Sequence, residues 1–172
     1  MAVDLKERVR DVPDWPEQGV VFRDITPLLR DPEALDETIR ALAEWGKERK
    51  PDVVLGAEAR GFILGAAIAR EIGSGFVPAR RPGKLPPETI GATYALEYGQ
   101  NTLELHPETI KKGDRVLIHD DVLATGGTVE AIAGLVESLG AEVVGVAFII
   151  ELTFLDGRER LQKYDLHSLI AY

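Results

Sequence analysis

Two neighbouring acids, Asp120 and Asp121, stand just before a glycine-containing turn in the stretch IHDDVLATGGTVEA, residues 118–131. The turn at residues 125–128 joins an apolar run to the start of an amphipathic segment. Glycines let several backbone N–H groups converge on one point, and a helix dipole adds positive potential there. Such a turn is typical of phosphate binding, whereas ionised carboxylates only accept hydrogen bonds and suit hydroxyl groups. The stretch therefore predicts a ligand like ribose 5-phosphate. The alternative, a plain turn with solvated acids, fits the combination less well.

Basic residues form a second group that could bind an anion. Arg60 follows another apolar run in GAEARGF, and Arg80, Arg81 and Lys84 occur within five positions. In a chain with a net charge of −9, such local positive charge predicts a second anion site. For Arg81 alone, a role in surface solubility is the alternative.

Histidine and cysteine give little support to metal or nucleophilic chemistry. The chain has no cysteine, which excludes disulfides and thiolate zinc sites, and its three histidines lack metal-ligand spacing. His119 lies within an apolar run, so we assign it a hydrogen-bonded position in the core rather than a catalytic role.

Composition limits the class of protein. The chain of 172 residues has 45% hydrophobic residues and mixed charges, which predicts one globular domain over residues 1–172. It contains no run of 18 apolar residues and no apolar signal core near its start, so we expect neither a membrane span nor secretion. The net charge argues against nucleic acid as the main partner.

The elements that must position these residues follow from periodicity. Strands are expected at residues 52–57, 76–80, 114–120, 141–152 and 166–171, and helices at 3–10, 32–50, 60–73, 128–139 and 155–161. Residues 93–98 and 101–106 alternate around Gly99-Gln100 and predict a hairpin, after a loop at 82–91. Buried strands that alternate with helices predict an α/β fold, a parallel sheet flanked by helices on both faces. Such sheets bind ligands beyond the carboxyl ends of their strands, where the acids and the glycine turn lie.

Five blocks of the sequence carry a family resemblance. VLIHDDVLATGGT resembles the phosphoribosyl pyrophosphate (PRPP) signature of type I phosphoribosyltransferases. GVVFRDITPLL, GAEARGFILGAA, VPARRPGKLP and YALEYGQNTLELH resemble the adenine phosphoribosyltransferase family in order and spacing. The resemblance covers residues 13–172, about the whole chain, and departs at His119, where the family usually carries an aliphatic residue.

The resemblance implies a function, partners and a setting. Members of this family make AMP and pyrophosphate from adenine and PRPP with Mg²⁺, usually as cytoplasmic homodimers. It also implies the type I phosphoribosyltransferase fold, with a small hood built from residues 1–30, approximately, and a flexible loop hairpin. Phosphoribosyltransferases for other purine bases are an alternative, which the Val-Val-Phe-Arg block argues against. A PRPP-sensing regulator without catalysis is another, but the sequence offers neither room nor a basic face for DNA binding.

The resemblance also implies roles for the matched residues. Binding of the 5′-phosphate falls to Ala124, Thr125, Gly126, Gly127 and Thr128. The ribose hydroxyls fall to Asp120 and Asp121. Pyrophosphate is expected to bind Arg60 and Lys84, with Arg80 reaching the site of the partner subunit.

The remaining roles concern the base and the lid. Val21, Phe22 and Arg23 are expected to form the adenine pocket, with Phe22 stacked on the base. Glu97 and Tyr98 are expected on the flexible loop, with Glu97 as the acid/base; Asp120, Asp121 and Arg60 complete the catalytic set. The resemblance assigns Mg²⁺ mainly to PRPP and pyrophosphate, without a direct protein ligand. It also implies a strained, non-proline cis peptide at Glu58-Ala59.

Overall fold

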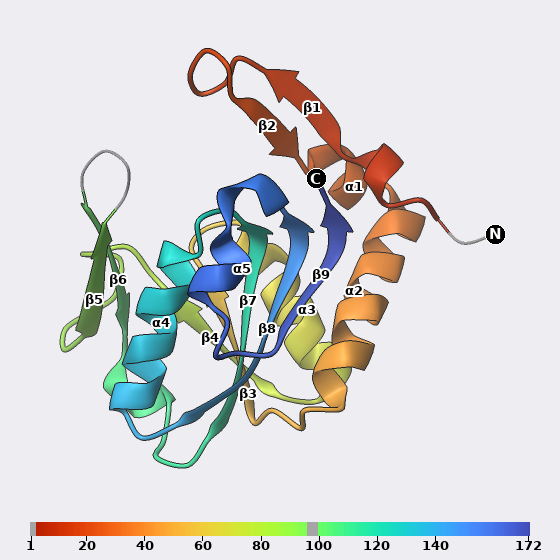
Figure 1. Ribbon diagram of the computed structural model, residues 1–172. Helices are drawn as coiled ribbons and strands as arrows, with labels where there is room; N and C mark the ends of the chain where they lie inside the picture. The colour runs from red at the N-terminus through yellow and green to blue at the C-terminus, as the bar shows by residue number, and fades with distance from the viewer. Residues whose placement is uncertain (1–2, 96–99) are drawn as a thin grey trace.

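Five parallel strands form the central sheet of the chain. The computed structural model describes residues 3–95 and 100–172. Within them the strand order is β4-β3-β7-β8-β9, as Figure 1 shows. The strands are β3 (Val53–Ala57), β4 (Gly75–Ala79), β7 (Arg115–Leu123), β8 (Glu142–Glu151) and β9 (Leu166–Ala171). Every neighbouring pair in this sheet is parallel, which confirms the predicted α/β class.

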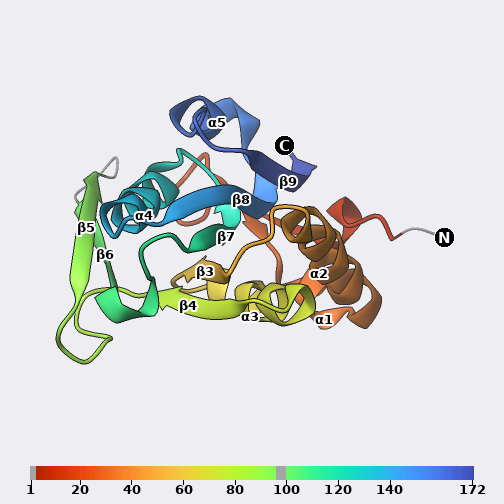
Figure 2. The same ribbon diagram turned by 90° about the horizontal axis from the view of Figure 1, so that it is seen from below.

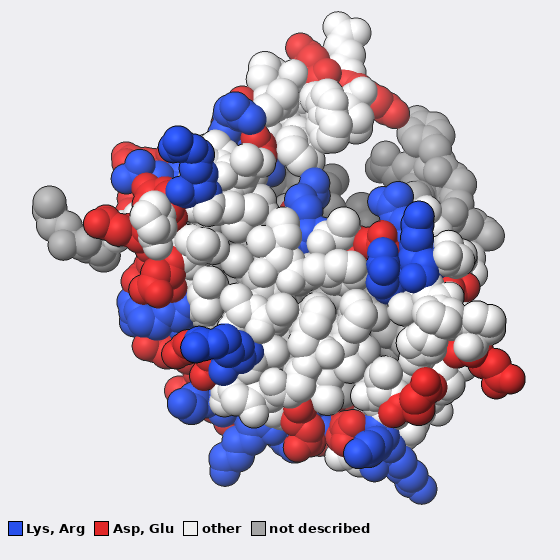
Figure 3. All heavy atoms as spheres, turned by 180° about the vertical axis from the view of Figure 1, so that it is seen from behind, with Lys and Arg blue, Asp and Glu red and all other residues white. Residues whose placement is uncertain are grey.

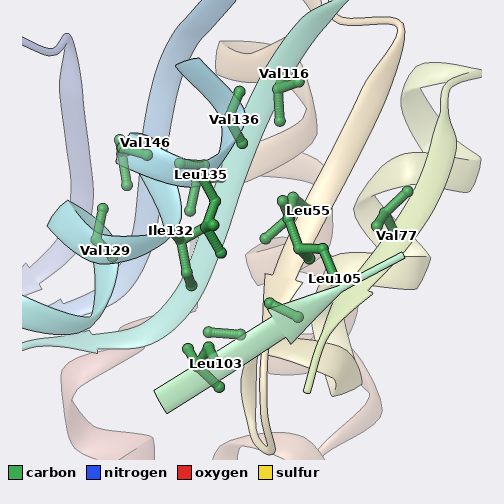
Figure 4. Close-up of a cluster of buried hydrophobic side chains, with 14 of the residues drawn as sticks. Leu55, Val77, Leu103, Leu105, Val116, Val129, Ile132, Leu135, Val136 and Val146 are labelled. Carbon is green, nitrogen blue, oxygen red and sulfur yellow. The ribbon is translucent and has the colours of Figure 1, made fainter. Parts of the chain in front are cut away.

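Helices cover both faces of this sheet (Figure 2). Helices α2 (Pro32–Lys47) and α3 (Gly61–Ile72) pack on one face, and α4 (Gly127–Ser138) packs on the other. Because neighbouring strand residues point to opposite faces, each strand contributes to two cores. Val116 and Ile118 join the core under α4, part of which Figure 4 draws, whereas Leu117 joins the core under α2 and α3. Burial on both faces explains the nearly continuous apolar runs of the strands.

The N-terminal segment corrects one prediction. Instead of a helix over residues 3–10, it forms a short 3₁₀ turn, η1 (Lys6–Arg8), followed by strand β1 (Arg10–Pro13). Strand β1 pairs antiparallel with β2 (Val21–Asp24), which the sequence patterns did not predict. The reason is non-local, because pairing with β2 satisfies backbone groups that an isolated helix of this length would hold only marginally. The hairpin stands beyond the carboxyl ends of the parallel strands (Figure 1).

A second hairpin packs beside α4. It consists of β5 (Ile90–Ala95) and β6 (Gln100–Leu105), paired from Ile90↔Leu105 to Ala95↔Gln100. The predicted hairpin is confirmed, but its strands begin earlier than expected, so Gln100 belongs to a strand rather than to the turn. The predicted loop before it ends where β5 begins. Glu97 and Tyr98 lie outside the described residues.

Two short helices and two 3₁₀ turns complete the fold. Helix α1 (Thr26–Arg30), missed in the sequence, precedes α2, whose N-cap Asp31 accepts hydrogen bonds from the N–H groups of Glu33 (3.0 Å) and Ala34 (3.3 Å). Short turns η2 (Pro107–Thr109) and η3 (Thr153–Leu155) and helix α5 (Gly157–Arg160) lead into β7 and β9. No helix within the described ranges is long and apolar enough to cross a membrane.

Candidate active site

A cavity of about 430 Å³ opens at the carboxyl ends of the strands, next to the β1–β2 hairpin. Its volume is in the usual range for a small-molecule site. It collects residues from β2, the loop after β3, strand β5, the end of β7 and the turn before α4. Of the residues given roles from the sequence, it brings together Val21, Phe22, Arg23, Arg60, Asp120, Asp121, Ala124 and Thr128.

The glycine turn, called here the phosphate turn (residues 124–128), encloses a smaller cavity of about 60 Å³ beside the first. All five residues of the turn line it, and both cavities share Asp120, Ala124 and Thr128. Gly126 has φ +81°, a left-handed conformation that favours glycine, and it caps α4 without a side-chain hydrogen bond. The first N–H groups of α4 can therefore donate hydrogen bonds to a bound anion.

The acid pair lies inside β7, which runs three residues further than predicted, to Leu123. Asp121 is only 4% exposed and pairs with the guanidinium of Arg60. Asp120 is partly exposed, and its Oδ1 accepts the N–H of Asp121 at 2.9 Å. Surrounding protein atoms, and then the neighbouring Asp121 carboxylate, raise the pKa of Asp120 well above its ordinary value. The two acids are thus in different electrostatic states before any ligand binds.

This pKa predicts that Asp120→Asn stabilises the ligand-free protein at neutral pH. When the pKa of a carboxyl is higher in the folded than in the unfolded chain, its ionisation destabilises the folded protein. This destabilisation develops as the pH rises from the unfolded-state pKa through the folded-state pKa. Asparagine does not ionise, and its Oδ1 can still accept the N–H of Asp121. The variant should have a higher Tm than wild type at pH 7, and the difference should shrink as the pH falls toward about 4, the ordinary carboxyl pKa. Thermal unfolding at several pH values checks this; a lower Tm for the variant at pH 7 would contradict it.

Arg60 lies between the acid pair and the Phe22 ring. It stands at the start of α3, where its Nε donates to Asp121. Its guanidinium carbon lies 5.1 Å from the centre of the Phe22 ring. The peptide between Glu58 and Ala59, two residues that also line the cavity, is cis, as predicted.

The basic side chains of residues 80–84 differ in whether they line the cavity. Arg81 lines the cavity, whereas the side chains of Arg80 and Lys84 are not part of its wall. The Glu58 carboxylate accepts the N–H of Arg81 at 2.7 Å and the Nε of Arg80 at 3.2 Å. Burial acts to raise the pKa of Glu58, but these bonds and charges together lower it, so Glu58 is an ionised partner for both arginines. In the sequence, Arg81 has the weakest expected role, because the run does not reveal which basic side chain faces the cavity.

Two aromatic residues that the sequence did not single out lie near Phe22 or in the cavity wall. Trp15 packs edge-on against Phe22, with ring centres 4.5 Å apart and planes at 69°. Tyr94, from β5, lines the cavity as well. Neither belongs to a local chemical motif, and the paired hairpins bring Trp15 to Phe22 and Tyr94 to the cavity.

Strand β2 presents backbone groups as well as side chains. Pro13 is opposite Val21 and has no N–H to donate. The two residues therefore cannot exchange the two backbone hydrogen bonds that a hydrogen-bonded antiparallel pair forms. The Val20 carbonyl accepts the N–H of Trp15 at 3.2 Å, so the residue before Val21 faces β1. Because backbone direction alternates, the N–H and C=O groups of Val21 and Arg23 point to the other edge of β2. No strand among the described residues pairs with that edge.

His119 occupies the core position predicted for it. It is completely buried, and its Nδ1 lies 3.0 Å from the Ala147 carbonyl oxygen. Burial lowers the pKa of His119 to about 4, so the imidazole is neutral at pH 7. The Nδ1–H therefore donates to Ala147, and this histidine is a packing residue behind the acid pair. In the part of the chain that the structure describes, no group of three or more His, Cys, Asp and Glu residues could hold a metal ion.

Known proteins resemble the chain over its whole length. Residues 25–169 match the family described as the phosphoribosyl transferase domain. The adenine phosphoribosyltransferase of Thermotoga petrophila is 55% identical over 170 residues, covering 99% of this chain and 100% of the relative. The crystal structure of adenine phosphoribosyltransferase from Thermoanaerobacter pseudethanolicus superposes with a TM-score of 0.95 at 50% identity, covering 98% of each chain. The enzyme of Saccharomyces cerevisiae, solved with an imino-altritol bisphosphate and adenine, gives 0.91 at 39% identity, covering 96% of each chain.

Proposed function

The chain belongs to the phosphoribosyl transferase domain family, and we propose that its cavity transfers the phosphoribosyl group of PRPP to adenine, giving AMP and pyrophosphate. One observation carries this function: the acid pair and the phosphate turn, through Ala124 and Thr128, border the same cavity as Phe22 of β2. A ligand with a 5′-phosphate, a ribose ring and a flat base meets a suitable group at each position. Full-length relatives named adenine phosphoribosyltransferase support the same substrate pair.

The reaction breaks the bond between C1′ of the ribose and the pyrophosphate oxygen, and leaves positive oxocarbenium character on the ring. Carboxylates beside the ring stabilise that charge, so the acid pair serves both to hold the ribose hydroxyls and to favour the transition state. Asp121 is already neutralised by Arg60. Binding of pyrophosphate to Arg60 would release this carboxylate toward the sugar.

Positive groups stabilise the leaving pyrophosphate. Arg60 lies at the cavity and is the first of them, and Arg81 is a second. Lys84 and Arg80 keep their predicted role only if the loop that carries them approaches the ligand or a partner subunit. Mg²⁺ is the implied metal, and the diphosphate oxygens of PRPP would hold it without a direct protein ligand. When bound, it neutralises negative charge on the pyrophosphate.

The base is held by β2. Phe22 supplies a face for stacking, and the backbone groups of Val21 and Arg23 supply hydrogen bonds to the base edge. Adenine attacks C1′ through N9, and Glu97, for which the family resemblance implies this role, is the proposed acid/base for its proton. A loop that closes over the ligand, as the family resemblance implies, would keep water from the activated ribose.

The test of transfer is whether pyrophosphate release from PRPP requires adenine. The purified protein with Mg²⁺ should release pyrophosphate only when both substrates are present. Release at the same rate without adenine would indicate hydrolysis, and no release in either case would exclude the proposed function.

A homodimer is proposed through the face of α3 and β4. Figure 3 shows this face with few charged side chains across its centre. Ile63 of α3 is 50% exposed, and Ala66 on the same helix is exposed too, although α3 buries its opposite side in the core. An exposed apolar helix face beside the edge strand β4 is typical of a subunit interface.

Ile63→Glu should therefore convert the dimer to a monomer, because it buries a charge at the centre of the interface. Light scattering after gel filtration should give the mass of two chains for wild type and of one chain for the variant at micromolar concentration. Phe154→Glu is the matched control, since Phe154 is 66% exposed on the separate turn η3. A wild-type monomer would refute the interface. We further propose a cytoplasmic enzyme without nucleic-acid partners, in keeping with its net charge of −9.

A further inference from the structure

The connection between β8 and β9 lies directly against the phosphate turn. This connection, called here the brace (residues 152–161), contains η3 and α5. Its first residue, Leu152, donates its N–H to the Leu123 carbonyl at 2.9 Å, immediately before the turn. Near its other end, Arg160 donates from Nη1 to the Thr125 carbonyl at 3.3 Å. Helix α5 packs beside the start of α4 (Figures 1 and 2).

Two glycines bring the backbones of turn and brace into direct contact. A Cβ at Gly157 would lie only 2.1 Å from the Ala124 carbonyl oxygen, far inside any allowed approach. From the other side, a Cβ at Gly126 would lie 3.0 Å from the Gly157 carbonyl oxygen. The position of the turn is therefore fixed by the position of the brace.

The brace is itself anchored in the sheet. Glu151, at the end of β8, is only 6% exposed and accepts two hydrogen bonds from Arg158, at 2.8 Å from Nε and 2.5 Å from Nη2. It also accepts the hydroxyl of Ser168, on β9, at 2.5 Å. Leu161, at the other end, is completely buried. A bidentate pair of this kind is rigid, so the brace is held at both ends.

We propose that Gly157 and Arg160 are positioning residues for the 5′-phosphate. They act through the turn: Gly157 permits its backbone path, and Arg160 fixes the peptide of Thr125 whose neighbours donate to the phosphate. Donors held in place before binding cost no reorganisation when the anion arrives. The inference rests on the proposed function, because it assumes that the turn binds the 5′-phosphate of PRPP and AMP.

The test compares two ligands by isothermal titration: ribose 5-phosphate, which needs the turn, and pyrophosphate with Mg²⁺, which does not. Gly157→Ala should raise the Kd for ribose 5-phosphate at least fivefold and leave that for pyrophosphate unchanged. Gly134→Ala is the matched control. It lies on α4, where an added Cβ meets nothing within 4 Å, so neither affinity should change. Equal affinities of wild type and Gly157→Ala for ribose 5-phosphate would overturn the inference.

Arg160→Met decides the matter if Gly157→Ala does not fold. Its side chain is partly exposed and pairs with Glu130 on α4, so its loss should be tolerated. It should weaken ribose 5-phosphate alone, and Arg160→Lys should recover part of the loss. Arg40→Met, which removes an exposed arginine from the outer side of α2, is the control. A similar loss for both ligands would indicate a general structural defect and refute positioning. Absence of ribose 5-phosphate binding in wild type would instead refute the proposed function.

Discussion

Adenine should be converted at least about a hundred times more efficiently than hypoxanthine or guanine. Stacking on Phe22 cannot produce this preference, because every purine has a similar face. The base edge must decide. Adenine offers a donor at its 6-amino group and an acceptor at N1, and the other two bases reverse both. The backbone N–H and C=O groups of Val21 and Arg23 point to an edge of β2 that lacks a partner strand among the described residues, so they can recognise that edge.

The expected size follows from unpaired groups. A wrong base would set donor against donor and acceptor against acceptor, and each buried group left unpaired costs about 1–3 kcal/mol. Two such mismatches amount to roughly a hundredfold or more in kcat/KM. Since the readers are backbone atoms, Val21→Ala should barely change the ratio between bases, and Phe22→Ala should weaken all bases by a similar factor. Comparable kcat/KM for adenine and hypoxanthine would refute this recognition while leaving phosphoribosyl transfer intact.

The double variant Asp120→Asn, Asp121→Asn should lower turnover of PRPP at least tenfold with the fold retained. A tenfold loss corresponds to about 1.4 kcal/mol, which is less than one or two charge-assisted hydrogen bonds to the ribose can contribute. The variant also removes the carboxylate charge that favours the oxocarbenium character of the transition state.

Steady-state kinetics with saturating adenine measures this effect, and circular dichroism checks the fold. Removal of the Asp121 charge leaves Arg60 without its ion pair, so the single variants separate the two acids. Asp36→Asn, an exposed acid on α2, is the control for the loss of one charge in each single variant and should keep wild-type activity. Near-normal turnover of a folded double variant would disprove the ribose role.

Local signals predicted the sheet and the turn that border the candidate site. The apolar runs and their helical partners define the parallel sheet, and the turn with Gly126 marks the start of α4 within one residue. Asp120 and Asp121 were assigned to the carboxyl end of the sheet, where ligands of parallel sheets bind. These features depend on short-range pattern and backbone conformation, which a sequence displays directly.

Features that depend on distant segments could not be read in this way. Strand β1 exists because β2 pairs with it, and Trp15 reaches Phe22 only through that hairpin. Arg81 lines the cavity, and its backbone N–H is held by Glu58, 23 residues earlier in the chain. Gly157 looks like an ordinary loop glycine until its contact with Ala124 is seen. In each case the determining partner is remote in sequence, and composition alone does not identify it.

The most direct test of the account is the product formed from PRPP and a panel of purine bases. The purified protein would be incubated with PRPP, Mg²⁺ and one base at a time, and the nucleotides identified by chromatography and mass spectrometry. We expect AMP from adenine, at a rate at least about a hundred times that of IMP or GMP formation from hypoxanthine or guanine. Nucleotide formation from none of the bases by the folded protein would contradict it.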